Sequence, residues 1–275
     1  MEQPLIRLPD THFAFLDLLK AIASQLIVLH HLAFYGPMAD HAYPLAPGVF
    51  EWLASHARLA VPVFLVIGGF LAAKSLAPHG VASIGHPLAT IWRRYVKLAP
   101  PFIAAMAIAV AAAALARVWM SHDSLPGVPS LPQIAAHALL LQSVLGYDAL
   151  SAGAWYVAID FQLYAMLTAL LWLSTRMVES PVRWLAAALI AIAAAASLLY
   201  FNRLPDWDAW GPYFFGSYAL GVLAWWASDA RRSASTRLLL FGAMLLLVLP
   251  ALAIDFRSRI AIALLSAIAI VGVRL

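Results

Sequence analysis

The sequence contains no cysteine among its 275 residues, and only 11% of them are charged. The absence of cysteine excludes a disulfide framework, a thiolate nucleophile and a cysteine metal site. Soluble globular domains carry roughly 25% charged residues, so a water-soluble fold of this composition would lack polar groups to cover its surface. With 64% hydrophobic residues, the chain is better suited to a lipid bilayer as its solvent.

Long apolar segments recur along the whole chain. A helix that crosses the hydrocarbon core needs roughly 20 predominantly apolar residues. The sequence predicts an all-α, polytopic transmembrane helix bundle of about eight spans, with residues 1–275 forming a single domain. The predicted spans are 15–35, 58–76, 98–119, 155–175, 183–200, 211–228, 236–254 and 258–274. The apolar segment 131–146 is too short to span easily and is interpreted as an interfacial or re-entrant helix.

Positive charge is divided unevenly between the two sides that these spans define. With a cytoplasmic N-terminus, eleven Lys and Arg residues lie on the cytoplasmic side and five on the other. The five are Arg58, Arg117, Arg203, Arg257 and Arg259. Because cytoplasmic loops are enriched in Lys and Arg, this division predicts that the N-terminus is cytoplasmic. The net charge of +4 therefore reflects topology, and no nucleic-acid partner is expected.

The first predicted span carries ionisable residues that are costly to place in lipid. At about 100° per residue, Asp17, Lys20, Ser24 and His31 share one helical face, whereas His30 points elsewhere. The rise from Lys20 to His31 is about 16 Å. One interpretation is a chemical site along this face. The other is a structural pair of Asp17 and Lys20 near the headgroups, together with a packed histidine.

The fourth predicted span contains Asp160, about 8 Å from the outer interface that Trp155 marks. His31 lies at a similar depth, about 6 Å from Tyr35. A histidine and a neighbouring carboxylate can form a general base and its orienting partner. The alternative is that the two helices are not neighbours and that Asp160 bonds to Gln162 or to a backbone group. The sequence leaves both possibilities open.

Three cations gather at the cytoplasmic start of the third span, in the segment WRRYVKLAPP. Arg94 and Lys97 are three residues apart, and Arg93 and Lys97 are four apart, so the cluster is expected on one side of a helix end. Such a cluster suits a polyanionic ligand, because arginine binds phosphate through two hydrogen bonds. On charge alone, anchoring to lipid phosphates is the simpler explanation.

The second span contains two adjacent glycines, Gly68 and Gly69, which allow close helix approach or a local kink. There is no GxSxG, P-loop or HExxH motif, and the histidines outside the first span have no metal-ligand spacing. No metal site is therefore expected.

Four of these segments, taken in order, resemble the acyltransferase-3 family of polytopic membrane acyltransferases. They read FLDLLKAIASQLIVLHH, VPVFLVIGGFL, RRYVKLAPPF and AWYVAIDFQLY, and the resemblance covers residues 13–165. The positions that match the family pattern are Lys20 and His31 in the first segment, Arg94, Lys97 and Pro100 in the third, and Trp155, Asp160 and Tyr164 in the fourth.

The sequence also departs from the family pattern. The departures are Lys20 and Lys97 in place of arginine, Gly68 and Tyr156 in place of serine, and Asp160 in place of glutamate. Lysine keeps the positive charge but loses the bidentate fork of arginine. The family generally has more spanning helices than the eight counted here, so we expect this chain to lack the last of them.

The resemblance implies an O-acyltransferase of the bacterial inner membrane. It would move an acyl group, expected to be acetyl, from cytoplasmic acyl-CoA to a hydroxyl of a carbohydrate or cell-envelope acceptor. Acyl-CoA is then a donor substrate, and no permanently bound cofactor is expected. The resemblance implies catalytic roles for His31 and Asp160, donor binding by Lys20, Arg93, Arg94 and Lys97, and supporting roles for Asp17, Trp155 and Tyr164. A transporter or flippase and a catalytically inactive membrane subunit are the alternatives.

Overall fold

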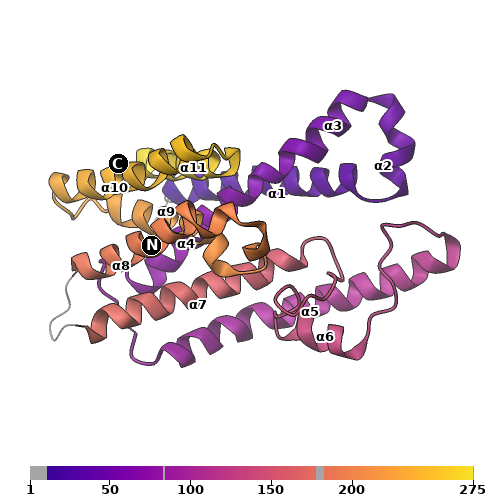
Figure 1. Cartoon of the computed structure of the whole chain (residues 1–275), viewed down its shortest axis with the longest axis horizontal. Helices are drawn as coiled ribbons and strands as arrows, with labels where there is room; N and C mark the ends of the chain where they lie inside the picture. The colour runs from indigo at the N-terminus through magenta and orange to yellow at the C-terminus, as the bar shows by residue number, and fades with distance from the viewer. Residues whose placement is uncertain (1–10, 83, 178–182, 275) are drawn as a thin grey trace, which may run out of the picture.

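The computed structural model describes residues 11–82, 84–177 and 183–274, and within these ranges all regular secondary structure is helical. Figure 1 shows the helices as an elongated bundle in which most of the long helices run along the same direction. The α-helices are α1 (Thr11–Phe34), α2 (Pro37–Ala42), α3 (Pro47–His56), α4 (Val61–Leu76), α5 (Pro87–Trp119), α6 (Leu131–Ala138), α7 (Ala154–Arg176), α8 (Arg183–Leu199), α9 (Gly211–Ala227), α10 (Ala234–Ile254) and α11 (Ser258–Arg274).

Six helical stretches in the described part of the chain are long and apolar enough to cross a membrane. They are Ala14–Phe34, Pro47–Leu76, Pro87–Trp119, Ala154–Arg176, Trp184–Arg203 and Ala234–Ile254. All six correspond to predicted spans, although the second and third begin about eleven residues earlier than the sequence suggested. The other two predicted spans form α9 and α11, which have only 17 residues each. They are shorter than the roughly 20 residues that a typical span needs.

Helix α9 occupies the centre of the bundle. Its residues 215–227 are all buried, and α4, α7, α8, α10 and α11 pack around it (Figure 1). A helix that is apolar on every side needs cover on every side. Here the other helices supply that cover, so α9 is the core on which the rest of the bundle assembles.

Helices α4 and α9 cross at two glycines. A Cβ added to Gly69 would lie 1.9 Å from the carbonyl oxygen of Tyr218, and one added to Gly221 would lie 1.9 Å from that of Val66. Only glycine permits helix backbones to approach this closely. The prediction of close helix approach in the second span is therefore confirmed at Gly69.

The loop before α9 is anchored to α7 well inside the bundle. The side-chain amide of Gln162 donates to the carbonyl of Ala209 at 3.2 Å, and its oxygen accepts from the backbone N–H of Gly211 at 2.7 Å. Gln162 follows Ala154, the first residue of α7, by a helical rise of about 12 Å. The start of α9 is therefore recessed relative to the start of α7.

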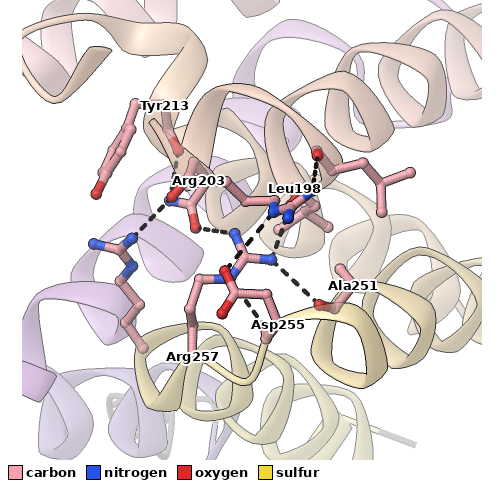
Figure 2. A network of polar contacts seen from close by, with 9 residues as sticks. Leu198, Arg203, Tyr213, Ala251, Asp255 and Arg257 are labelled. Atoms are coloured by element: carbon pink, nitrogen blue, oxygen red, sulfur yellow. Dashed lines mark hydrogen bonds and ion pairs between the residues drawn. The ribbon is translucent and has the colours of Figure 1, made fainter. Parts of the chain in front are cut away.

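Arg257, between α10 and α11, ties the ends of two helices together (Figure 2). Its guanidinium donates to the carbonyls of Leu198 at 2.9 Å and Ala251 at 3.4 Å. The Leu198 carbonyl lies in the last turn of α8, where the helix supplies no partner, whereas the Ala251 carbonyl also accepts the backbone N–H of Asp255. The cation also complements both helix dipoles. Burial lowers the pKa of Arg257 below its ordinary value, although the nearby carboxylate of Asp255 acts in the opposite direction.

The same network reaches the start of α9 at Tyr213 (Figure 2), through Asn202. The side-chain oxygen of Asn202 accepts from Arg257 at 2.7 Å, and its amide donates to the carbonyl of Tyr213 at 2.9 Å. Arg259 donates to the Asn202 carbonyl at 2.9 Å and lies over the Tyr213 ring at 4.8 Å. Two arginines that the sequence suggested only as topology charges thus connect three neighbouring helix ends.

The segment 131–146 is helical over only part of its length. α6 ends at its eighth residue, and the chain then turns through Leu140, which has a φ of 59°. His137 is buried, and its ring nitrogens bond to the carbonyl of Gln133 and the backbone N–H of Leu150. These bonds stabilise the turn, so the helix is shorter than the apolar pattern suggests.

We expect Gly69→Ala and Gly221→Ala each to lower the free energy of unfolding by about 3 kcal/mol or more, because the new methyl group meets backbone atoms that cannot move aside. The matched control is Gly242→Ala on α10, where an added Cβ meets nothing within 4 Å. Its stability should be kept or slightly raised, since alanine favours helix more than glycine does. Thermal unfolding in detergent, followed by size-exclusion chromatography, measures the difference. Equal melting temperatures for all three variants would contradict the close crossing.

Candidate active site

A partly buried ion pair joins α5 to α7, and the Arg94 side chain in it is 33% exposed. Asp160 on α7 is only 8% exposed, and its Oδ2 lies 2.5 Å from Nη2 of Arg94 on α5. A hydrogen bond between two charged groups is stronger than a neutral one. Loss of either partner would leave the other charge uncompensated in an apolar interior, which is costly. Each residue therefore makes the burial of the other possible.

Aromatic rings and a glycine surround this pair. The guanidinium carbon of Arg94 lies 5.1 Å from the ring centre of Tyr164, one turn along α7 from Asp160, which is a cation–π geometry. A Cβ added to Gly68 on α4 would lie 3.4 Å from Oδ1 of Asp160 and 3.2 Å from the ring of Tyr218 on α9. Four helices, α4, α5, α7 and α9, thus meet around one carboxylate.

Of the three cations at the start of α5, Arg94 alone turns toward the bundle. Arg93 and Lys97 are exposed on its outer side, and Arg93 donates to the hydroxyl of Thr90 at 3.1 Å. Successive helical residues are about 100° apart, so Arg93 and Arg94 face different surroundings. The structure therefore does not bring the predicted cluster together around a single point.

Lys20 on α1 forms an ion pair with Asp17, at 2.6 Å from Nζ to Oδ1. The protein leaves 42% of the Lys20 side chain and 68% of the Asp17 side chain uncovered. This is the structural pair that the sequence offered as one interpretation of the first span. α1 packs against α3, α4 and α11, whereas α5 packs against α6 and α7. Lys20 and Arg94 thus lie on helices with different sets of neighbours.

His31 lies near the C-terminal end of α1 and has a ring nitrogen without a bond. Its Nδ1 is buried and has no hydrogen-bond partner in the described residues. Its ring centre lies 5.3 Å from that of His30 and 5.6 Å from that of Tyr35. His30 differs, because its Nδ1 lies 3.1 Å from the carbonyl oxygen of Leu53. The free nitrogen leaves His31 able to accept or donate a proton.

No hydrogen bond or ion pair joins His31 to Asp160 across the described ranges. The carboxylate instead binds Arg94, a partner that neither interpretation of Asp160 included. Gln162, the other candidate partner, is bonded to the loop before α9. Arg94 and Asp160 are 66 residues apart in the sequence, so helix periodicity alone cannot pair them.

Trp155, in the first turn of α7, packs against α9. Its ring centre lies 5.8 Å from that of Phe214 and 6.0 Å from that of Tyr156. Sequence reasoning missed Tyr218, which is 1% exposed beside Gly68 and the carboxylate. A tyrosine among the small residues of GSYALG could have indicated it, because a buried phenol usually needs a polar partner.

Apolar helices of spanning length around a charged, buried pair define a polytopic membrane protein with an ionisable site in its interior. A family model described as an acyltransferase domain, that of the acyltransferase-3 family, matches residues 13–273. This match covers nearly the whole chain, so the protein belongs to the acyltransferase-3 family, and the resemblance of the four segments is confirmed. Neither a search of curated proteins nor a search of solved structures gave a significant match. Membership supports a membrane acyltransferase in general.

Replacing one partner of the ion pair, in Arg94→Met or Asp160→Asn, should lower the free energy of unfolding by about 3 kcal/mol, because one charge then stays buried alone. The double variant should lose less than the sum of the two singles. Arg93→Met, at an exposed neighbouring position, is the control and should unfold like the wild type. Melting temperatures in detergent test this cycle, and strictly additive losses would show that the two residues do not interact.

Proposed function

We propose that the protein is a membrane O-acyltransferase that moves an acyl group, acetyl foremost, from cytoplasmic acyl-CoA to a hydroxyl of a carbohydrate or cell-envelope acceptor. Family membership supports the acyl transfer. The observation that carries the proposal is the Arg94 guanidinium, which a single carboxylate holds inside an apolar bundle. Acyl-CoA carries phosphates, and arginine is well suited to bind them through paired hydrogen bonds.

The proposed topology has eight helices in the bacterial inner membrane and a cytoplasmic N-terminus. The uneven division of Lys and Arg between the loops supports this orientation. α9 and α11 complete the eight, and α9 can be short because other helices rather than lipid cover it. The start of α5 then faces the cytoplasm, the side from which acyl-CoA arrives. In this topology Asp160, which contacts Arg94, lies further from the outer interface than the roughly 8 Å expected from the sequence.

In this proposal, the exposed cations of α5 and the inward-facing one have different roles in donor binding. Arg93 and Lys97 are exposed at the helix end and attract the phosphates of acyl-CoA. Arg94 then exchanges the carboxylate of Asp160 for a donor phosphate. Asp160 is therefore a positioning residue that keeps Arg94 pointed inward before the donor arrives. Lys20, held by Asp17, extends the positive charge onto α1.

Proton transfer falls to His31. A neutral imidazole can take the proton of an attacking hydroxyl, or it can carry the acyl group for a short time. The unbonded Nδ1 supports this role, because a nitrogen already occupied by the protein would have to release its partner first. His30, one residue earlier, is held by Leu53 and does not have this freedom.

We expect His31→Ala to reduce O-acetylation of envelope glycans by about 100-fold or more, since a positioned acid–base group contributes at least that factor. Mass spectrometry of polysaccharide extracted from cells with matched protein levels gives the measurement. The control is His41→Ala, at an exposed position on α2, which should acetylate at the wild-type level. Acetylation that persists unchanged in His31→Ala cells would remove His31 from the mechanism.

Arg94→Ala should weaken acyl-CoA binding to the detergent-solubilised protein by at least about tenfold, because one charge-assisted contact to phosphate contributes roughly 1.5–3 kcal/mol. Arg94→Lys should recover part of this loss, because lysine keeps the charge without the fork. Equilibrium binding of acetyl-CoA distinguishes the two variants. Failure of the wild-type protein to bind acetyl-CoA at all would overturn the proposed function.

A further inference from the structure

Three side chains outside the Arg94 site form a hydrogen-bonded chain between two separate segments. In the loop that follows α5, the Ser124 hydroxyl oxygen lies 2.7 Å from Nδ1 of His122. On the other side of the ring, Nε2 of His122 lies 3.0 Å from Oδ2 of Asp40, which belongs to α2. A serine, a histidine and a carboxylate connected in this order can activate the serine as a nucleophile.

The backbone determines which nitrogen carries the proton. The N–H of Ser124 donates to Nδ1 of His122 at 3.1 Å, so Nδ1 must present its lone pair. In the neutral ring, the proton then lies on Nε2 and is donated to Asp40. The lone pair of Nδ1 is then shared between the backbone N–H of Ser124 and the Ser124 hydroxyl, which is the closer donor at 2.7 Å. The ring is thus oriented as a base toward the serine, with Asp40 behind it, although the two nitrogens exchange the roles they have in serine proteases.

The loop that carries Ser124 is held in place by its own contacts. Arg117, in the last turn of α5, donates to the carbonyls of Pro126 at 2.5 Å and Gly127 at 3.2 Å. The hydroxyl is bordered by Gly36, where an added Cβ would lie 3.7 Å from Oγ. A nucleophile on a braced loop beside a glycine is both fixed in position and open to an incoming group.

Ser124 borders the segment that follows the helix of His31. Gly36, its spatial neighbour, comes two residues after Phe34, the last residue of α1. Ser124 therefore borders the end of α1 that carries His31. In the proposed topology this is the outer end, where the hydroxyl acceptor arrives.

We propose that Ser124 is a second nucleophile, which holds the acyl group as an ester before the acceptor takes it. This inference rests on the proposed acyltransferase function. Ser124 and His122 are the catalytic residues of this step, and Asp40 is a positioning residue.

The step needs only an acyl donor and an alcohol. The Ser124 hydroxyl attacks the acyl carbon while Nδ1 of His122 takes its proton. The bond from the acyl carbon to the His31 imidazole, which has carried the acyl group from acyl-CoA, breaks, and that imidazole takes the proton from His122. An acceptor hydroxyl then gives its proton to Nδ1 and attacks the ester. Ser124 leaves with that proton, and the acyl group ends on the acceptor oxygen.

A fluorophosphonate probe tests the nucleophile on the full chain in detergent. Peptide mass spectrometry should find the adduct on Ser124, with none in Ser124→Ala. Labelling should slow about 100-fold in His122→Gln, because the base is lost. It should slow about tenfold in Asp40→Asn and recover in Asp40→Glu, which a purely structural role for the aspartate would not require. An unlabelled Ser124 in folded wild-type protein would overturn the inference.

The loop supplies matched controls for these variants. Ser121 and Asp123 are exposed neighbours of the two loop residues that carry the chemistry. Ser121→Ala and Asp123→Asn should be labelled at the wild-type rate and should elute from size exclusion like the wild type. Equal labelling of Ser121 and Ser124, or a wild-type rate in His122→Gln, would mean that the contact is a loop brace without catalytic power.

Glycan acetylation in cells separates this inference from the proposed function. Acetylation should be lost in Ser124→Ala as well as in His31→Ala. If cells that lack the protein keep wild-type acetylation, the proposed function fails. If Ser124→Ala keeps it, the ester intermediate fails whatever the probe shows. Probe labelling of Ser124 should continue in His31→Ala, because the probe does not depend on acyl-CoA.

Discussion

A charge inside an apolar helix bundle needs a counter-charge, and the pairing of Arg94 with Asp160 meets this requirement. The pair joins α5 to α7, and the carboxylate in turn lies against α4 and α9 through Gly68 and Tyr218. The positions of four helices therefore depend on one electrostatic contact. The Arg94 side chain remains 33% exposed, so its guanidinium reaches the edge of the bundle while the carboxylate lies inside.

The positions of the long helices along the chain were predicted well from the sequence, because a long run of apolar residues is a strong local signal. All eight predicted segments are helical in the described residues. The arrangement of the helices did not follow. Nothing in the composition of α9 distinguishes it from a lipid-facing span, since a helix that is apolar all round can be covered by lipid or by protein. The glycines at 69 and 221 were the one local sign of its central place, and only Gly69 was recognised.

The individual residues of the site could be predicted from the sequence, but the contacts between residues on different helices could not. Asp17 and Lys20 are one turn apart, and their ion pair follows from helix geometry. Arg94 and Asp160 lie on different helices, so their contact depends on packing that a single sequence does not encode locally. The same reason explains why Asp40, His122 and Ser124 were not singled out. His122 and Ser124 are neighbours in the sequence, but Asp40 is 82 residues away from His122.

The length and position of α9 have a consequence for the membrane itself. Seventeen helical residues rise only about 26 Å, less than the hydrocarbon core of roughly 30 Å. The anchoring of its leading loop to Gln162 places the shortfall on the side where α7 begins. Because the surrounding helices cover α9, the protein rather than a thinned bilayer accommodates this shortfall. The start of α9 therefore ends in a recess within the bundle, because the first turns of α7 extend beyond it.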